Sequence, residues 1–297
     1  KQETKAAAPA PAPAPAQAAA KPVAPGIASA TPSSIPRGWM SGQMQDWKLT
    51  VDKVIEHAHF NHGSREIVTR SVEGPIVRST YSDLYYRARK CSNALLADGV
   101  QKGDRVATLA WNTARHIETW YGTMCIGAVL HTLNPRLFPE QIAWIINHAE
   151  DTHVFYDITF QPIVEAIKDK VPSVKHWIVL TDAAHKPQSS IANLRTYEEY
   201  IAPHSTDVVW GDFPEDTACG LCYTSGTTGD PKGVLYSHRS NILHTMIGLQ
   251  KDAIGIGAAD ATLPVVPMFH ANAWGLAFSG PPTGSKLVLP GAKMDGE

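Results

Sequence analysis

Tyr223-Thr224-Ser225-Gly226-Thr227-Thr228-Gly229-Asp230-Pro231-Lys232-Gly233 is the most informative stretch of the 297-residue chain. It combines several hydroxyl side chains with three glycines and one lysine within eleven residues. Glycines let backbone N–H groups approach an anion closely, hydroxyls donate hydrogen bonds, and a lysine adds a mobile positive charge. The stretch therefore predicts a loop that binds phosphate groups.

The residues on either side predict that this loop joins two strands. Ala218–Tyr223 is short and mostly apolar, as expected of a buried strand, and Val234–Tyr236 predicts a second strand. Ser237 is a suitable N-cap for a helix that begins at His238.

Two common nucleotide-binding loops are excluded. The G-x-x-x-x-G-K-[ST] pattern is absent because Lys232 follows Pro231 and precedes Gly233. No G-x-G-x-x-G sequence opens a helix here, which excludes the dinucleotide-binding turn. A Gly-Thr-Thr-Gly tetrapeptide alone is more often an ordinary turn between strands, so only the full stretch favours phosphate binding.

The whole stretch closely resembles the phosphate-loop signature of the adenylate-forming (AMP-binding) enzymes, which include acyl-CoA synthetases, luciferases and peptide-synthetase adenylation domains. In that family the loop holds the β- and γ-phosphates of ATP while a carboxylate attacks the α-phosphate. The resemblance implies nucleotide-binding roles for seven residues of this chain: Thr224, Ser225, Gly226, Thr227, Thr228, Gly229 and Lys232.

Composition limits the class of protein. The chain is 43% hydrophobic and 18% charged, with a net charge of −2, which is not typical of a nucleic-acid-binding protein. No apolar run is long enough for a membrane helix, and the N-terminus lacks the apolar stretch of a secretory signal. The four cysteines favour a reducing compartment, either the cytoplasm or one such as the mitochondrial matrix. Cys219-x-x-Cys222 suggests a redox or metal half-site, but its position favours buried strand cysteines.

Residues 1–36 form a separate region, in which Pro9, Pro11, Pro13 and Pro15 alternate with alanine and no aromatic residue occurs. We expect a disordered, extended linker that either tethers the next domain to a partner or is a fusion scar. Residues 37–297 are expected to form one domain. The chain does not begin with Met and ends at Glu297 without a terminating pattern, so we expect a fragment.

Residues 37–297 predict an α/β fold of layered sheets with flanking helices. The expected helices are 50–59, 81–96, 114–126, 139–148 and 160–170, and the expected strands are 105–110, 128–132, 152–156 and 176–180. Strands that alternate with helices indicate a largely parallel sheet. Glu66–Val72 and Ile76–Thr80, separated by Glu73-Gly74-Pro75, predict a hairpin.

Two further sequence segments favour one branch of the family. Both resemble sequences of medium- and long-chain fatty-acyl-CoA synthetases and do not resemble those of peptide-synthetase domains. They are Gly103-Asp104-Arg105-Val106-Ala107 and His131-Thr132-Leu133-Asn134-Pro135-Arg136-Leu137. The resemblance extends from about residue 45 to 297, the N-terminal portion of such an enzyme.

A second group of candidate residues lies at Pro267-Met268-Phe269-His270-Ala271-Asn272-Ala273-Trp274-Gly275. Leu263–Met268 predicts a strand that runs into a short helix, with His270 at the junction, where α/β sheets usually bind ligands. A histidine satisfied in a half-buried turn is the alternative. The family resemblance implies a catalytic role for His270 beside the acyl and phosphate groups. It also implies that Trp274 and Gly275 line the substrate's tail; the residues that bind metal stay unknown.

The resemblance implies an acid–thiol ligase that acts in two half-reactions. A fatty or related carboxylate attacks Mg²⁺-bound ATP to give an acyl-adenylate and pyrophosphate, and the thiol of coenzyme A then attacks the adenylate. Residues 1–297 contain no Tyr-Gly-x-Thr-Glu-like segment and no counterpart of the family's small C-terminal domain, both of which the resemblance places after Glu297. We therefore expect the fragment to be inactive alone.

Three alternatives stay open. The acyl group could pass to a carrier-protein thiol, or the adenylate could be used oxidatively. The chain could instead be a non-catalytic binding module tethered through residues 1–36. The residues also leave open whether the protein forms a homodimer.

Overall fold

The computed structural model describes residue 40 and residues 47–224 and 230–293. The predicted linker over residues 1–36 therefore lies outside the described residues. Contacts divide the chain between Asp46 and Trp47, and nearly all described residues belong to the part that begins at Trp47. Among the described residues, no helix combines the length and apolar character needed to cross a bilayer.

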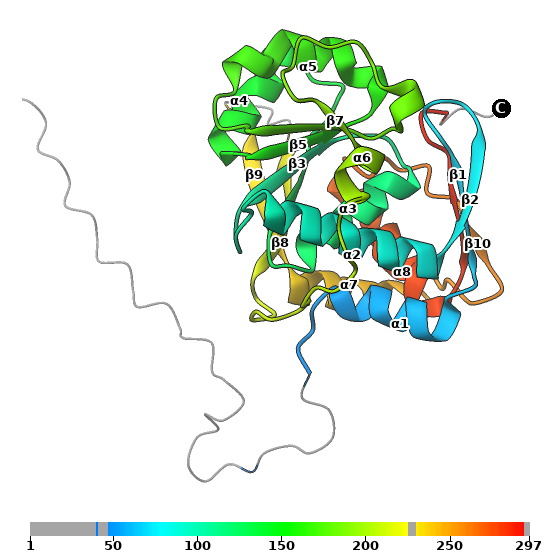
Figure 1. Ribbon diagram of the computed structural model, residues 1–297. Coiled ribbons are helices and arrows are strands. Elements are labelled where there is room, and N and C mark those ends of the chain that lie inside the picture. The colour runs from blue at the N-terminus through cyan, green and yellow to red at the C-terminus, as the bar shows by residue number, and fades with distance from the viewer. Residues whose placement is uncertain (1–39, 41–46, 225–229, 294–297) are drawn as a thin grey trace, which may run out of the picture. The chain divides into compact units, whose positions relative to one another are not determined.

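Strands and helices alternate along most of the chain (Figure 1). The strands are β1 (Glu66–Arg70), β2 (Ile76–Thr80), β3 (Arg105–Leu109), β4 (Val129–Thr132), β5 (His153–Tyr156), β6 (His176–Val179), β7 (Arg195–Thr196), β8 (Ala218–Thr224), β9 (Lys232–Ser237), β10 (Ala261–Thr262) and β11 (Lys286–Leu289). The α-helices are α1 (Asp52–His62), α2 (Tyr81–Ala97), α3 (Ala114–Met124), α4 (Pro139–Ala149), α5 (Gln161–Ile167), α6 (Tyr197–Ile201), α7 (His238–Gly248) and α8 (Leu276–Thr283). Short 3-10 turns are η1 (Ile158–Phe160), η2 (Lys168–Lys170), η3 (Ala183–His185) and η4 (Ala271–Gly275).

The strands form two sheets, which confirms the predicted α/β fold. The larger has the order β7-β6-β5-β3-β4-β8-β9 and is parallel except for the antiparallel pair of β8 and β9. The smaller has the order β10-β11-β1-β2, in which β1 and β2 form the predicted antiparallel hairpin.

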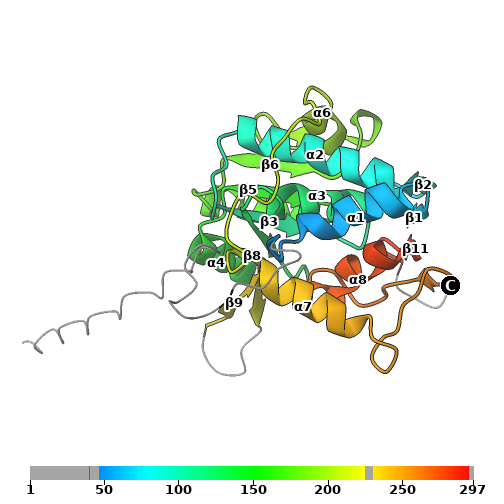
Figure 2. The same ribbon diagram turned by 90° about the horizontal axis from the view of Figure 1, so that it is seen from below.

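Helices cover both faces of the larger sheet: α4 and α5 lie on one face, and α2 and α3 on the other (Figure 1). Each face has its own apolar core, because alternate residues of a strand point to opposite sides. In β5, Phe155 packs into the core of the α2–α3 face, whereas Val154 and Tyr156 pack into the core of the α4–α5 face. Seen from below, α1, α7 and α8 lie side by side (Figure 2).

Local signals explain why several helices begin where they do. Thr80 and Asp83 form a capping box at the start of α2, and the Ser237 hydroxyl accepts a hydrogen bond from the Ser240 N–H at the start of α7. The prediction of Ser237 as an N-cap is thus confirmed. Cys219 and Cys222 are buried free thiols within β8, as their apolar surroundings predicted.

The predicted strand over Leu263–Met268 is wrong. The strand in this part of the chain, β10, covers only Ala261–Thr262, which pairs with β11. Residues 263–268 follow an irregular path, with Leu263 and Val265 exposed. The prolines at 264 and 267 have no N–H to donate to a sheet ladder, so the apolar pattern is overridden. His270 therefore does not lie at the end of a strand.

Candidate nucleotide and acyl site

The phosphate-loop stretch includes the end of β8, the start of β9 and the residues that connect them. Thr224, the last residue of β8, lies directly opposite Lys232, the first residue of β9, in the antiparallel register. Residues Ser225, Gly226, Thr227, Thr228 and Gly229 lie outside the described residues. Pairing of β8 with β9 thus places both described ends of the loop together, with Thr224 and Lys232 exposed.

This loop leaves the larger sheet at an edge suited to ligand binding. Thr132 in β4 pairs in parallel with Cys222 in β8, so Thr224 lies at the carboxyl ends of the parallel strands. Ligands of open α/β sheets bind outside the carboxyl ends of the strands. Tyr223, next to the loop, is fixed from α4 by a 2.6 Å hydrogen bond between its hydroxyl and His148 Nδ1.

The second group of predicted residues forms an unusual turn. Asn272, Ala273 and Trp274 have φ of 51°, 50° and 55°, and Ala271 has φ of 44°, so η4 is left-handed. Left-handed helical backbone costs an L-residue roughly 1–2 kcal/mol. Such strain is found most often at functional sites, where the surrounding structure enforces it.

Side chains join this turn to the phosphate-loop strand. The thiol of Cys222, which lies two residues before Thr224, donates a 3.4 Å hydrogen bond to Asn272 Oδ1. A pocket of about 400 Å³ lies beside the turn. Its lining residues are Tyr236, Ser240, Asn241, His244, Ala271, Asn272, Trp274 and Gly275.

Two of the three predicted residues of this segment line the pocket. Trp274 is 65% exposed and forms part of its wall. Gly275 has φ of 74°, and a Cβ at this position would lie 2.7 Å from the His244 ring, so only glycine fits without displacing His244. His270 is exposed at the start of the turn and is not among the residues that line the pocket.

Sequence reasoning missed the contribution of α7. Asn241 and His244 lie three residues apart and therefore face the pocket from one side of the helix. Their polar side chains at helical spacing, directly after the phosphate loop, were the signal that could have identified them.

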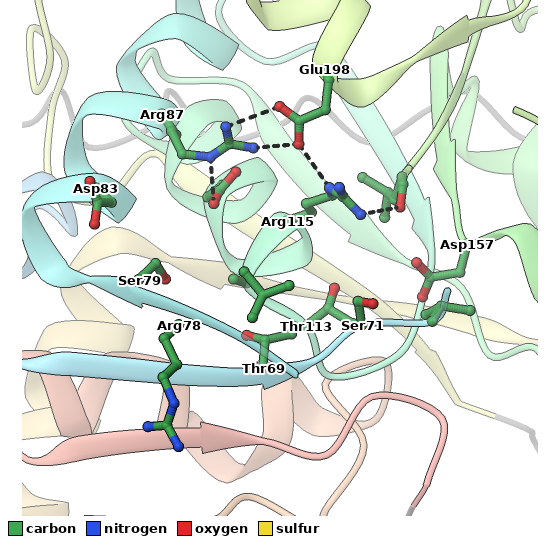
Figure 3. A pocket seen from close by; sticks show the side chains of 15 residues that line it. Thr69, Ser71, Arg78, Ser79, Asp83, Arg87, Thr113, Arg115, Asp157 and Glu198 are labelled. Atoms are coloured by element: carbon green, nitrogen blue, oxygen red, sulfur yellow. Dashed lines mark hydrogen bonds and ion pairs between the residues drawn. The ribbon is translucent and has the colours of Figure 1, made fainter. Parts of the chain in front are cut away.

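A separate cavity of about 360 Å³, with charged and hydroxyl side chains in its lining, lies outside the carboxyl ends of β3, β5 and β6 (Figure 3). Four buried side-chain atoms that line it have no hydrogen-bond partner among the described residues: Thr69 Oγ1, Ser71 Oγ, Glu118 Oε2 and Asp157 Oδ1. The other Asp157 oxygen accepts a 2.6 Å hydrogen bond from the Trp111 N–H. None of the predicted site residues lines this cavity.

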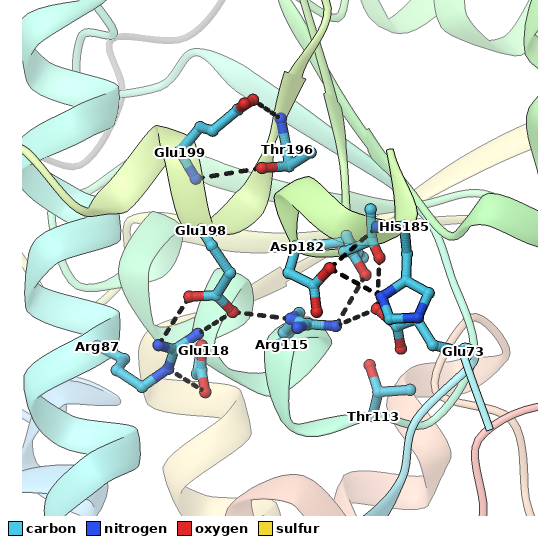
Figure 4. Close-up of polar contacts among 12 residues, drawn as sticks. Glu73, Arg87, Thr113, Arg115, Glu118, Asp182, His185, Thr196, Glu198 and Glu199 are labelled. Carbon is cyan, nitrogen blue, oxygen red and sulfur yellow. Dashed lines mark hydrogen bonds and ion pairs between the residues drawn. The ribbon is translucent and has the colours of Figure 1, made fainter. Parts of the chain in front are cut away.

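Two arginines and three glutamates form a network at this cavity (Figure 4). Arg87 pairs with Glu118 and Glu198, and Arg115 pairs with Glu198 and Glu73. Burial raises the pKa of Glu198, but hydrogen bonds and charge from the two arginines outweigh it and hold that pKa below its usual value. The network joins α2, α3 and α6 to the β1–β2 connection.

Two groups of side chains have the spacing of metal ligands, but a nearby arginine neutralises a carboxylate in each. In one, Arg195 Nη2 lies 2.5 Å from Asp98 and 3.0 Å from His176. In the other, which contains Glu73, Arg115 forms the ion pair described above. Neither group includes a residue of the candidate nucleotide and acyl site.

The buried carboxyl group of Asp157 is expected to make the stability of the fold depend on pH. Burial raises its pKa to about 7, whereas an unfolded aspartate loses its proton near pH 3.9. Between these values the folded state holds the extra proton, so this residue's contribution to stability falls as pH rises. Asp157→Asn keeps the acceptor for the Trp111 N–H and cannot ionise. Urea unfolding at pH 4 and pH 8 measures the effect. We expect the free energy of unfolding of the variant, minus that of wild type, to be about 1–3 kcal/mol larger at pH 8 than at pH 4.

The control is Asp212→Asn, which changes an exposed carboxylate and is expected to alter stability by less than about 0.5 kcal/mol at both pH values. Equal pH dependence of wild type and Asp157→Asn would contradict the prediction.

Comparison with known proteins agrees with this architecture. A sequence model described as "AMP-binding enzyme" matches residues 55–295. The chain is 46% identical over 258 residues to a 3-methylmercaptopropionyl-CoA ligase of Ruegeria lacuscaerulensis, with coverage of 87% of this chain and 48% of the relative. It is also 46% identical over 257 residues to a medium-chain-fatty-acid–CoA ligase of Ectopseudomonas oleovorans, with coverage of 86% and 47%.

Solved structures share the fold. The inhibitor-bound N-terminal domain of FACL13 from Mycobacterium tuberculosis superposes with a TM-score of 0.69 at 26% identity, covering 80% of this chain and 56% of that one. The anthranilate CoA ligase AuaEII, solved with anthranoyl-AMP, has a TM-score of 0.73 at 23% identity. The match covers 89% of this chain and 47% of the AuaEII chain.

The fold thus defines an N-terminal domain of the adenylate-forming class of ligases. The chain belongs to the AMP-binding enzyme family, as its phosphate-loop stretch predicted. It spans about half the length of the curated relatives it matches.

Proposed function

We propose that this chain binds ATP and a carboxylic acid for adenylation, as part of an acid–CoA ligase. The observation that carries the proposal is the pairing of Thr224 with Lys232, which anchors both ends of the phosphate-loop stretch at the carboxyl edge of the sheet. In this proposal residues 37–297 supply the adenylation domain and residues 1–36 act as a linker. Coenzyme A accepts the acyl group in the second half-reaction.

The first half-reaction needs positioning and charge neutralisation rather than covalent catalysis by the protein. Hydroxyl and backbone N–H groups of Thr224, Ser225, Gly226, Thr227, Thr228 and Gly229 hold the β- and γ-phosphates. The Lys232 ammonium offsets part of the charge of the departing pyrophosphate, and a Mg²⁺ ion, when bound, would supply further charge neutralisation. Lys232 is exposed at the start of β9, where its ammonium can reach a bound phosphate.

The acid is proposed to be a medium- or long-chain fatty acid or a similar aliphatic carboxylate. Relatives named for medium-chain fatty acids and for 3-methylmercaptopropionate are both 46% identical to this chain. Trp274 and Gly275 line a pocket of about 400 Å³ that would take the aliphatic tail. His270, exposed at the entrance to the turn, would meet the carboxylate and the α-phosphate.

Lys232→Ala tests the proposal. We expect the affinity for ATP or pyrophosphate to fall at least about tenfold, because a charge-assisted contact to phosphate is lost. Isothermal titration on these 297 residues is the measurement, since binding does not require turnover. Lys251→Ala, which removes an exposed lysine elsewhere, is the control and should leave the affinity unchanged.

ATP binding that is the same in wild type and Lys232→Ala would contradict the role of the loop. The alternatives have separate tests. Transfer to a carrier-protein thiol instead of coenzyme A would appear in a thiol-acceptor assay. A tethered binding module would lose partner association when residues 1–36 are deleted.

A further inference from the structure

Asn112 links the larger sheet to the segment that precedes His270. It lies between β3 and α3 and is fully buried. Its Nδ2 donates hydrogen bonds of 2.8 Å to the Pro264 carbonyl and 2.9 Å to the Val266 carbonyl. Its Oδ1 accepts a 2.7 Å hydrogen bond from the Met268 N–H. One side chain thus satisfies three backbone groups of a five-residue segment.

The segment needs such a partner because it does not join a sheet. Its prolines at 264 and 267 cannot donate hydrogen bonds, yet its buried carbonyl and N–H groups must still be satisfied. The Asn112 amide supplies the two donors and one acceptor that a neighbouring strand would otherwise provide. Asn112 therefore determines the path of the backbone between β10 and the left-handed turn.

Hydrogen bonds continue from this segment into the site. The His270 N–H donates to the Pro267 carbonyl at 3.0 Å, and the Ala273 N–H donates to the His270 carbonyl at 3.0 Å. The contact that fixes Met268 is therefore two residues from His270 and leads directly into the turn that carries Trp274.

Asn112 is itself held on both sides. Trp111, the preceding residue, donates its N–H to Asp157, and its carbonyl contacts His116 Nδ1 at 2.9 Å. The Asn112 carbonyl accepts a 3.0 Å hydrogen bond from the Gly291 N–H, beyond the end of β11. The residue thus joins the carboxyl ends of β3 and β11, which makes it a rigid anchor.

We propose that Asn112 is a positioning residue, which sets the location of His270 and Trp274 relative to the phosphate loop. This inference rests on the proposed function and assigns to Asn112 the alignment of the acyl pocket with the bound nucleotide. The role requires an amide. An aspartate would place a carboxylate oxygen against two carbonyl oxygens, and an alanine would leave all three backbone groups unpaired.

The test uses Asn112→Ala and Asn112→Asp with two readouts on these 297 residues. The first is hydrogen exchange of the Met268 amide, expected to be at least about tenfold faster in Asn112→Ala. The second compares affinity for ATP with affinity for a fatty-acyl sulfamoyl-adenosine, a stable mimic of the acyl-adenylate. We expect both variants to bind the mimic about tenfold more weakly and ATP within about twofold of wild type.

Asn147→Ala is the matched control. The Asn147 side chain also donates to a backbone carbonyl, that of Lys170, but it lies at an exposed position of α4. It should change neither readout.

Equal weakening of ATP and mimic binding would indicate a general loss of structure and would overturn the inference. So would wild-type affinity for the mimic in both Asn112 variants. Failure of the wild-type chain to bind either ligand would contradict the proposed function and, with it, this inference. Failure of the proposed function can be distinguished from failure of the inference about Asn112, because the former is seen with the wild-type chain before any substitution.

Discussion

Arg115→Met is expected to reduce the free energy of unfolding by about 3 kcal/mol, since it removes one partner from a buried ion pair. The Arg115 guanidinium donates to Glu73 and Glu198, and the Glu73 side chain is only 4% exposed. Methionine fills similar volume but leaves Glu73 with hydrogen bonds from uncharged groups alone. Chemical denaturation at neutral pH and constant ionic strength measures the loss.

Arg78→Met is the matched control for this prediction. Arg78 pairs with Glu66 at the surface, where the arginine side chain is 61% exposed. Surface ion pairs contribute about 0–1 kcal/mol, so the control should cost less than about 1 kcal/mol. A loss for Arg115→Met as small as that for Arg78→Met would show that the network is effectively solvated.

Gly291→Ala is expected to destabilise the chain by about 3 kcal/mol through backbone strain combined with overlap. Gly291 has φ of 62°, and a Cβ there would overlap the Arg70 carbonyl oxygen at the end of β1. Because the obstacle is backbone rather than a flexible side chain, β1 and β11 would have to separate locally. Urea unfolding and the Met268 amide exchange rate should both report the change.

Gly99→Ala separates the two causes. Gly99 has φ of 90°, but nothing lies within 4 Å of a Cβ built there, so only backbone strain of about 1 kcal/mol is expected. If both alanine variants lost the same free energy, overlap with Arg70 would not contribute.

Elements defined by neighbouring residues could be predicted from sequence. The start of α2 follows from Thr80 and Asp83, three residues apart, and that of α7 follows from Ser237. The apolar run of β8 and the hairpin of β1 and β2 were likewise visible as short-range patterns. Here periodicity and capping agree with the tertiary fold, so local reasoning was sufficient.

Prediction failed where distant residues decided the conformation. The apolar pattern of residues 263–268 predicted a strand, but Asn112, 156 residues before Met268, holds this segment outside the sheet. The left-handed turn over Ala271–Gly275 has only a weak local signal, because Asn272 and Gly275 adopt positive φ readily whereas Ala271, Ala273 and Trp274 do not. Its conformation is enforced by packing, including the contact between Asn272 and Cys222.

The family and the α/β fold could be read from the amino-acid sequence, because they depend on motifs and periodicities within short stretches. The phosphate-binding role of residues 224–232 stays a prediction. Which distant side chains come into contact could be seen only in the tertiary structure. It placed Asn241 and His244 beside Trp274, and it paired Arg115 with Glu73 and Glu198 across 42 and 83 residues. Such contacts depend on how the sheets and helices pack, and the spacing of residues along the chain carries no record of that packing.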